Sequence, residues 1–239
     1  MFIYVFITTY NRSQRLKILL DDLLQKKGKH KLQIVVYDDA STLRYDFIDR
    51  YIEKYNIEYV KFDFNHGRYR YWRLINYAFK QIKDTKYDYY IMLPDDITLC
   101  NEFFKRAINT WEAIRDNRKI CLNLLLDKGR RGVANWTGFK PVKVKFGGFE
   151  VFRTQWVDLC FIATKKCFKE LKYRIHAIDF SRWQGKNCEL LSSGVGAQVS
   201  DRLNKSGWHL YQVTDSLVYH GDHPSVMNPE ERRRSRLVT

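Results

Sequence analysis

The chain has 239 residues, of which 45% are hydrophobic and 15% aromatic, and it carries a net charge of +15. This length and composition exclude a disordered chain and indicate a single globular domain, or one with a small appendage. No apolar run approaches the ~20 residues of a membrane-spanning helix. Residues 1–7 lack the basic leader of a signal peptide, and the five widely spaced cysteines contain no C-x-x-C pair. We therefore expect reduced thiols and a cytoplasmic protein.

The positive charge is concentrated in the second part of the chain. Residues 1–100 hold 17 Lys and Arg against 13 Asp and Glu, a net of +4. Residues 101–239 hold 25 against 14, a net of +11. This distribution favours a polyanionic partner, either nucleic acid or an anionic membrane surface. A basic surface kept for solubility is the alternative.

The first hundred residues alternate between strand-like and helix-like patterns. Buried strands are predicted at residues 2–8, 32–37 and 57–64, and from 89 up to a pair of carboxylates at 95–96. Amphipathic helices are predicted from about residue 13 to the segment 26–31, at 44–55 and at 70–83. This alternation predicts a parallel sheet with right-handed crossovers.

The pattern loosens after residue 100. Helices are expected at 102–116, 165–171 and 194–206, and strands at 119–126, 156–164, 209–213 and 216–220. The stretch 127–152 has weak periodicity, and 173–190 is expected to be irregular. We find no repeat or linker, so one domain is predicted, with a first half at 1–100, a second half at 101–227 and a charged tail at 228–239.

Three predicted strands end in polar turns, at residues 8–12, 38–42 and 95–96. In an open α/β sheet such ends lie side by side and form the ligand crevice. Adjacent carboxylates such as Asp95 and Asp96 repel each other unless a cation or donor lies between them. A hard divalent cation, Mg²⁺ or Mn²⁺, would remove that repulsion. An ordinary Asp-rich turn is the alternative.

Four motifs in this order, F-I-T-T-Y-N-R, V-V-Y-D-D-A-S-T, N-H-G and I-M-L-P-D-D, carry a family resemblance. Over about residues 1–105 the chain resembles the nucleotide-sugar half of a family 2 glycosyltransferase with a GT-A fold. The resemblance implies an α/β, Rossmann-like, mostly parallel sheet flanked by helices. It also implies an enzyme that moves a sugar from a nucleotide-sugar, with a UDP-sugar favoured, to a hydroxyl group with Mn²⁺ or Mg²⁺.

Carried over by position, the resemblance assigns roles to the strand-end residues. Thr8, Thr9 and Tyr10 would line the nucleoside pocket, with Arg12 near the diphosphate. Asp39 would accept a hydrogen bond from uracil and Asp38 would support its loop, while Asn65 and Gly67 would shape the donor site. Asp95 and Asp96 match the last two positions of the acidic metal motif. Pro94 stands at its first acidic position, so Asp96 is the expected metal ligand and Asp95 the lesser candidate.

The C-terminal group H-G-D-H, which begins at His220, follows a predicted strand. Imidazole is a competent Mn²⁺ ligand beside carboxylate oxygen, and a C-terminal histidine completes the metal shell in some GT-A enzymes. The resemblance therefore assigns His220 to the metal. A histidine hydrogen-bonded within a loop is the alternative.

An inverting transfer needs a carboxylate that takes the proton of the acceptor hydroxyl. Many family members carry an acidic pair just before the closing helix, but residues 193–196 contain no carboxylate. Asp158 is the first candidate for the base, followed by Asp179 and Glu189. A helix cap or a structural ion pair is the alternative role of Asp158.

The stretch 117–186 holds 16 Lys and Arg against five acids, with interleaved aromatics. Cations neutralise phosphates and aromatic faces stack on bases, so we expect this stretch to contact the acceptor. The candidate acceptor residues are Lys128, Arg130, Arg131, Trp136, Lys143, Lys145 and Trp156. The favoured acceptor is a 5-hydroxymethyl-pyrimidine in DNA, as in viral base modification. The alternatives are a surface polysaccharide or lipid-linked glycan, a non-catalytic nucleic-acid-binding module, or simply a solvated loop.

Overall fold

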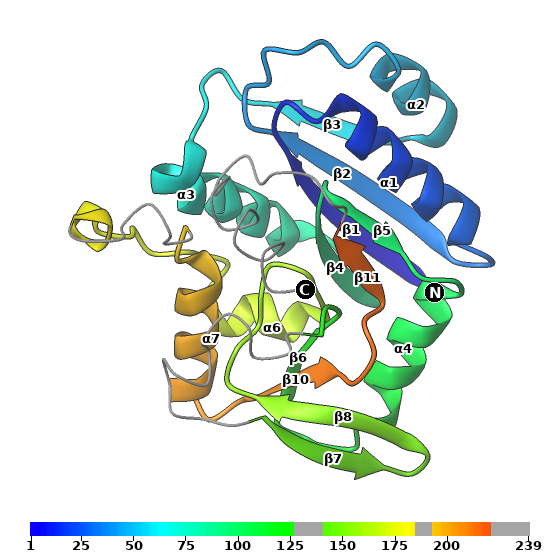
Figure 1. The fold of residues 1–239 in the computed structure, drawn as a ribbon, viewed down its shortest axis with the longest axis vertical. Helices are drawn as coiled ribbons and strands as arrows, with labels where there is room; N and C mark the ends of the chain where they lie inside the picture. Colours follow the sequence, from blue (N-terminus) through cyan, green and yellow to red (C-terminus); the bar gives the residue numbers. More distant parts are fainter. Residues whose placement is uncertain (127–140, 185–192, 221–239) are drawn as a thin grey trace, which may run out of the picture.

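The computed structural model describes residues 1–126, 141–184 and 193–220 (Figure 1). Within these ranges the chain forms one nine-stranded sheet and one two-stranded sheet. The strands are β1 (Phe2–Thr9), β2 (Lys31–Asp38), β3 (Glu58–Lys61), β4 (Tyr89–Pro94), β5 (Ile97–Leu99), β6 (Lys119–Asn123), β7 (Val142–Phe146), β8 (Phe149–Thr154), β9 (Phe161–Ala163), β10 (His209–Val213) and β11 (Val218–His220). The helices are α1 (Ser13–Lys26), α2 (Ile48–Tyr55), α3 (Gly67–Gln81), α4 (Phe103–Ala113), α6 (Lys165–Glu170) and α7 (Val195–Lys205), with 3₁₀ turns η1 (Ile82–Asp84) and η2 (Phe180–Trp183).

The large sheet has the order β3-β2-β1-β4-β9-β6-β10-β8-β7. Its first four strands are parallel, as the sequence predicts. Their register places Thr9 beside Asp38 and Thr8 beside Pro94. The polar turns that follow β1, β2 and β4 therefore meet at one edge of the sheet, as expected from parallel strands.

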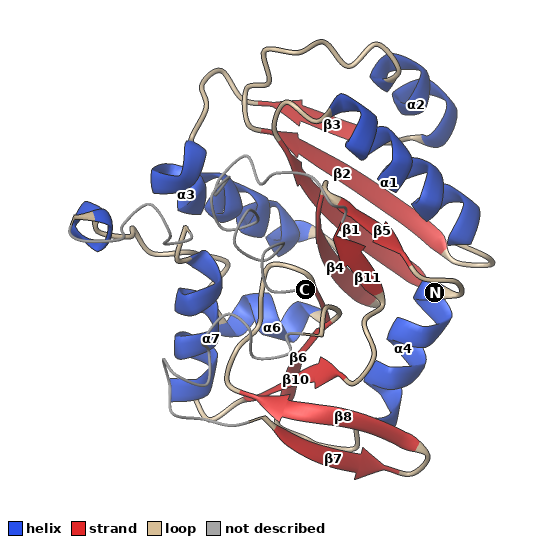
Figure 2. Cartoon of the chain, in the orientation of Figure 1, coloured by secondary structure: helices blue, strands red, loops and turns tan. Residues whose placement is uncertain are grey.

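Helices cover both faces of the sheet, because successive side chains of a strand point to opposite faces (Figure 2). Ile3, Val5 and Ile7 of β1 belong to the core that contains buried residues of α1, α2 and α4. Tyr4 and Phe6 belong to the core that contains residues of α3, α6 and α7. β1 is buried almost throughout, which explains its unbroken apolar sequence.

The second half of the sheet is mixed. β9 lies antiparallel between β4 and β6, β10 runs parallel to β6, and the β7–β8 hairpin adds two antiparallel strands at the edge. This hairpin occupies part of the stretch 127–152, for which the sequence predicts no strand. Its edge strand β7 reads V-K-V-K-F and is largely exposed, so it lacks the apolar pattern of a buried strand. The strand expected at 156–164 is confined to Phe161–Ala163.

A small second sheet connects the end of the described chain to the segment after the carboxylates. β11 pairs antiparallel with β5, with Val218 opposite Leu99 and His220 opposite Ile97. β5 has only three residues and was not expected from the sequence. Its pairing brings His220 beside the residue that follows Asp96, although 124 positions separate the two in the chain (220 minus 96).

Two further observations concern membrane-spanning helices and cysteines. No helix in the described ranges is long and apolar enough to cross a membrane. Four cysteines are free thiols in the buried interior, at positions 100, 121, 160 and 167. Cys188 lies outside the described residues.

Candidate active site

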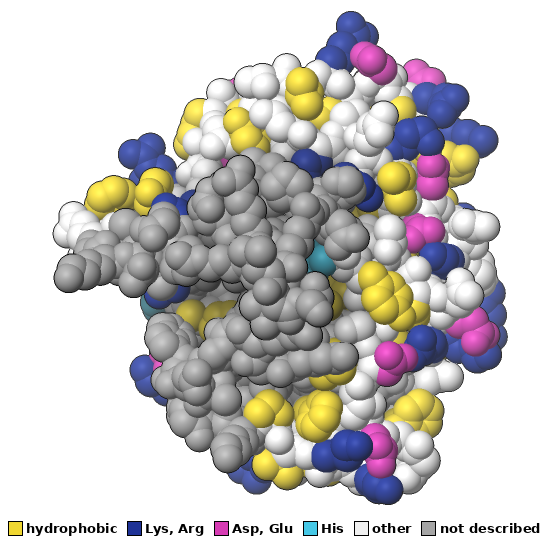
Figure 3. Space-filling model, in the orientation of Figure 1, with side chains coloured by type: hydrophobic (Ala, Val, Ile, Leu, Met, Phe, Trp, Pro, Cys, Tyr) yellow, Lys and Arg dark blue, Asp and Glu magenta, His cyan; other side chains and the backbone are white. Residues whose placement is uncertain are grey.

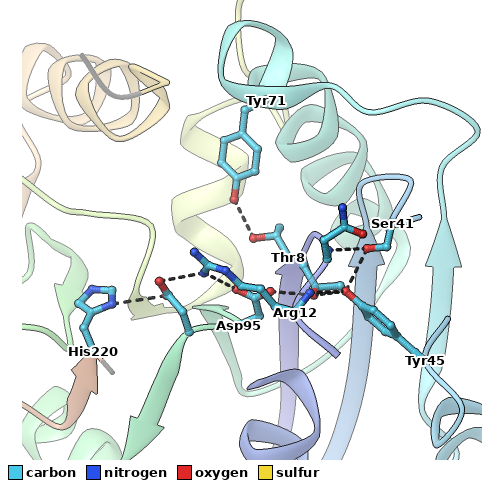
Figure 4. Close-up of polar contacts among 10 residues, drawn as sticks. Thr8, Arg12, Ser41, Tyr45, Tyr71, Asp95 and His220 are labelled. Carbon is cyan, nitrogen blue, oxygen red and sulfur yellow. Dashed lines mark hydrogen bonds and ion pairs between the residues drawn. The ribbon is translucent and has the colours of Figure 1, made fainter. Parts of the chain in front are cut away.

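The carboxylates of Asp95 and Asp96 are buried at the carboxyl end of β4, with residue exposures of 4% and 7%. The Thr9 hydroxyl donates a hydrogen bond of 2.7 Å to Oδ2 of Asp95. The Arg12 guanidinium nitrogen Nη1 lies 3.0 Å from Oδ1 of Asp95 and 2.9 Å from Oδ2 of Asp96 (Figure 4). One cation therefore bridges two neighbouring anions, which is what the sequence required of any stable acidic pair.

Burial dominates the electrostatics of this pair. Burial raises the pKa of Asp95, the Arg12 charge and the Thr9 hydroxyl lower it, and the Asp96 charge raises it, so that the resulting pKa is about 6. Burial also acts to lower the pKa of Arg12, but both carboxylates outweigh it and the net shift is upward. The guanidinium thus stays charged.

His220 provides the additional nitrogen that a metal would need. Its Nδ1 lies 3.4 Å from Oδ1 of Asp96 (Figure 4). That Nδ1 is buried and has no hydrogen-bond partner within the described ranges. A carboxylate oxygen and an imidazole nitrogen that face each other suit Mn²⁺. The described residues contain no group of three or more His, Cys, Asp and Glu side chains that could hold a metal. A cation here would therefore take further ligands from water or substrate phosphate, as Mg²⁺ commonly does.

Asp38 stabilises the loop after β2. Its Oδ1 accepts hydrogen bonds of 2.9 and 2.5 Å from the backbone and hydroxyl of Ser41, and Oδ2 accepts one from the Tyr59 hydroxyl. Ser41 also accepts a bond of 2.8 Å from the backbone N–H of Asn11 in the turn after β1. Asp38 is fully buried. This geometry agrees with the supporting role that the resemblance assigned to it.

Asp39 is surrounded by four donors from the segment that begins α3. Oδ1 meets the backbone N–H of His66 at 2.8 Å and its ring Nδ1 at 2.6 Å. Oδ2 meets the Asn65 amide and the Gly67 backbone N–H, each at 3.1 Å. An ionised carboxylate has about four acceptor sites, so all of them are in use. A uracil N–H would have to replace one of these donors.

Gly67 is required for that arrangement. Its φ is +53°, a region that favours glycine, and an added Cβ would approach the Asn65 side-chain oxygen to 3.1 Å. The N-H-G motif therefore turns the chain so that its own donors point at Asp39.

Tyr71 connects α3 to the end of β1. Its hydroxyl shares a hydrogen bond of 2.7 Å with the hydroxyl of Thr8 (Figure 4). Burial raises the pKa of Tyr71, the Thr8 bond lowers it, and the charges of Asp95, Asp39 and Asp158 add to the rise. Asp158 therefore lies within electrostatic reach of the same hydroxyl as the two strand-end carboxylates.

Cys160 gives a second indication of the position of Asp158. Burial raises the pKa of this thiol well above its usual value, and the charges of Asp158 and Asp96 add to the rise. Oδ1 of Asp158 accepts a hydrogen bond of 2.8 Å from the backbone N–H of Leu159. The charges of Asp158 and Asp96 therefore both act on this thiol, while the hydrogen-bond partner of Asp158 in the described ranges is its own neighbour in the chain.

Asp179, the second candidate for the base, is exposed, unlike the half-buried Asp158. It caps η2 by accepting a bond of 2.7 Å from the backbone N–H of Ser181, which holds its pKa below the usual range.

Tyr10 is half-buried in the turn after β1. Trp156 is half-buried and contacts α7, where an added Cβ on Gly196 would lie 3.4 Å from its ring.

The other predicted site residues divide into two groups. Lys143 and Lys145 lie on β7 and pair with Glu150 of β8 at 3.2 and 3.0 Å. Five predicted site residues lie outside the described residues: Lys128, Arg130, Arg131, Trp136 and Glu189.

Sequence reasoning did not identify several polar residues that hold the site together. The Tyr45 hydroxyl contacts the hydroxyls of Thr9 and Ser41 at 3.1 and 2.9 Å and accepts the Arg12 backbone N–H at 3.0 Å. Tyr71 was missed in the same way. In a single amino-acid sequence, a tyrosine of the site has the same pattern as any other aromatic residue of the core. No feature of the sequence therefore distinguished Tyr45 and Tyr71. His66, by contrast, stood between the two residues of the N-H-G motif that were chosen.

Comparisons with known proteins agree with this geometry. Residues 4–117 match a family described as glycosyl transferase family 2. A search of curated proteins finds no match. Among solved structures, S. aureus TarS residues 1–349 with UDP-GlcNAc aligns at a TM-score of 0.63 and 15% identity, covering 96% of this chain and 61% of that one.

Two other solved structures have the same fold. The mannosyltransferase PcManGT from Pyrobaculum calidifontis, with GDP-Man and Mn²⁺, gives a TM-score of 0.61 and 16% identity over 99% of this chain and 61% of that one. GalNAc-T7 with UDP, GalNAc and Mn²⁺ gives a TM-score of 0.63 and 15% identity, over 91% of this chain and 43% of that one. The chain therefore spans between 43% and 61% of the length of these three proteins.

These matches confirm the GT-A fold that the sequence predicts. The family match covers the four strand-end motifs and both carboxylates that follow β4. Residues 4–117 of this chain are therefore similar to glycosyl transferase family 2, within a chain that has the GT-A fold.

Proposed function

We propose that this chain transfers a sugar from a nucleotide-sugar, with a UDP-sugar as the first candidate, to a hydroxyl group with Mn²⁺ or Mg²⁺. The observation that carries this proposal is the buried pair Asp95 and Asp96, flanked by Arg12 and His220 at the carboxyl edge of a family 2 region. It is supported by neighbours whose structures contain UDP-GlcNAc, or GDP-Man or UDP together with Mn²⁺.

Asp96 and His220 would hold the divalent cation. When bound, such a cation neutralises the diphosphate that leaves the sugar. Thr9 keeps Asp95 oriented through its 2.7 Å hydrogen bond, so the pair is arranged before any ligand arrives. This preorganisation is what electrostatic catalysis requires.

The donor nucleoside would lie over the turns after β1 and β2. One wall of this nucleoside site would consist of Thr8, Thr9 and Tyr10. The other wall would be the loop after β2, which contains Asp38 and Asp39. Because the Asp39 carboxylate already meets four donors, we assign it first to holding Asn65 and Gly67 in place. Its predicted contact with uracil then requires that one of those donors gives way.

For the proton transfer we propose Asp158. The acceptor oxygen forms a bond to the anomeric carbon, the bond from that carbon to the diphosphate oxygen breaks, and the acceptor proton passes to the base. The charges of Asp158 and Asp95 both raise the pKa of Tyr71. The charges of Asp158 and Asp96 both raise the pKa of Cys160. Asp179, by contrast, is exposed and engaged in capping η2.

The acceptor is proposed from the charge of the second half of the chain and from the aromatic residues interleaved with it. The +11 of residues 101–239 favours DNA that carries a 5-hydroxymethyl-pyrimidine, and the predicted viral and cytoplasmic setting goes with it. No comparison supports a DNA acceptor. On the face in Figure 3, the Lys and Arg side chains outside the grey region are interspersed with Asp and Glu. A surface polysaccharide or lipid-linked glycan is therefore the rival acceptor.

A transfer assay tests the proposal. Duplex DNA with 5-hydroxymethylcytosine, or a polysaccharide, is incubated with a panel of UDP-sugars and Mn²⁺, and products are measured by mass spectrometry. We expect a nucleoside heavier by one sugar, and no product with D96N. UDP release without modified DNA would keep the transferase and point to a glycan. No release from any nucleotide-sugar would contradict the proposal and leave a nucleic-acid-binding module.

A further inference from the structure

Arg12 has an unusual position for a residue expected near the diphosphate. Its single nitrogen Nη1 contacts one oxygen of Asp95 and one of Asp96, at 3.0 and 2.9 Å. The three side chains are 15%, 6% and 8% exposed, so the contact is largely shielded from water. A shielded ion pair is screened much less by salt than an exposed one.

The main chain of Arg12 is fixed, whereas its side chain has an alternative partner. Its backbone N–H donates to the Tyr45 hydroxyl at 3.0 Å, and its carbonyl accepts the N–H of Leu16 at 3.0 Å, the first turn of α1. The guanidinium is a planar fork that suits phosphate as well as carboxylate. A change of side-chain torsions alone can therefore exchange the carboxylates for a phosphate.

The guanidinium and a divalent cation would compete for the same carboxylates. Oδ2 of Asp95 receives the Thr9 hydroxyl, and the other contacts on the pair include Nη1 on Oδ1 of Asp95 and on Oδ2 of Asp96. Oδ1 of Asp96 faces His220, so a metal held by Asp96 and His220 would share the Asp96 carboxylate with Arg12. Two cations on one carboxylate repel each other, so each weakens the binding of the other.

We propose that Arg12 is an internal stand-in for the divalent cation, which keeps the metal from binding until the nucleotide diphosphate arrives to take the guanidinium. In this arrangement the metal and the nucleotide bind together rather than one after the other. Arg12 is then a positioning residue that moves from the carboxylates to the phosphates. This inference rests on the proposed function, in that the phosphates are those of the nucleotide-sugar.

Manganese binding provides the test, because it can be measured without turnover. The free Mn²⁺ signal in electron paramagnetic resonance is recorded against protein concentration, with and without UDP, for the wild type and for R12M. Methionine keeps the apolar stem and removes the charge. We expect R12M to bind Mn²⁺ alone at least tenfold more tightly than the wild type. We also expect UDP to raise the Mn²⁺ affinity of the wild type at least tenfold, and that of R12M less than threefold.

Matched variants separate this effect from general ones. Arg15 lies three residues further along α1 and makes no ion pair with either carboxylate, so R15M should bind Mn²⁺ like the wild type. R12K keeps a positive charge but replaces the planar guanidinium with a compact ammonium group. Its Mn²⁺ affinity should lie between those of the wild type and R12M. Folding of each variant is checked by its thermal unfolding transition, and R12K replaces R12M if R12M does not fold.

The decisive comparison is made without nucleotide. Equal Mn²⁺ affinities of R12M and the wild type in the absence of UDP would overturn the inference, whatever UDP does. If R12M binds Mn²⁺ more tightly but UDP binds neither protein, the competition stands and the proposed donor is wrong. The two failures are therefore distinguishable.

Discussion

The two ends of the nine-stranded sheet handle charge in opposite ways. At the β3-β2-β1-β4 end, Asp38, Asp39, Asp95 and Asp96 are all less than 8% exposed, and each has an identified partner. At the β8-β7 end, Lys143, Lys145 and Glu150 pair with one another on an open hairpin, with side chains 36–73% exposed.

This difference shows that the polar groups are held by fixed partners only where their carboxylates are buried. A buried carboxylate loses hydration, and only fixed donors or cations make up for that loss. The donor end therefore has a geometry that exists before any ligand arrives. The exposed pairs of the hairpin gain little from their contacts and can rearrange around a partner.

Loss of the proposed metal ligand, Asp96, should have the largest effect. In D96A the carboxylate that faces His220 is gone, so we expect the Mn²⁺-supported affinity for UDP to fall at least a thousandfold, or about 4 kcal/mol. Calorimetric titration of UDP in the presence of Mn²⁺ measures this. D46A is the matched control, since Asp46 is 84% exposed and pairs only locally with Arg44 among the described residues. An unchanged UDP affinity in D96A would remove Asp96 from the metal site.

The second effect concerns folding rather than binding. In D39N an amide N–H₂ replaces one of the oxygens that meet the donors of residues 65–67, so buried donors lose their acceptor. We expect the free energy of unfolding to drop by about 3 to 4 kcal/mol, measured by urea denaturation. D63N, at an exposed aspartate in the same loop, should change it by less than about 0.5 kcal/mol. A small loss in D39N would mean that the four contacts contribute little.

The third effect depends on pH. Burial raises the folded-state pKa of Asp95 to about 6, above its ordinary value of 3.8. A raised carboxyl pKa favours the folded state below pH 4, and this advantage is lost as the pH rises through 6. The lost amount is roughly 2 to 3 kcal/mol. In the absence of metal, D95N should therefore gain that much stability relative to the wild type between pH 4 and pH 7.5. A difference that does not vary with pH would show that Asp95 titrates normally.

The sequence predicted the donor end well because its chemistry is local. Each polar turn directly follows an apolar strand, so the positions of Thr9, Asp38 and Asp95 along the chain already place them at one edge of a parallel sheet. His220 was chosen by resemblance, and the three-residue strand β5 that brings it to Asp96 was too short to detect. The bridging of both carboxylates by Arg12, and the tyrosine hydroxyls of 45 and 71, depend on side-chain packing that no spacing reveals.

The β7–β8 hairpin should show the smallest effect on stability. Lys143 and Lys145 are 53% and 73% exposed, so the double variant K143A/K145A should change the free energy of unfolding by less than about 0.5 kcal/mol and leave UDP affinity unchanged. The same variant tests the proposed nucleic-acid contact. If both lysines neutralise phosphates, the affinity for duplex DNA falls and the slope of its logarithm against that of salt concentration becomes shallower by about two. An unchanged slope would place the acceptor away from this hairpin, because a phosphate contact cannot be lost without losing its share of released counterions.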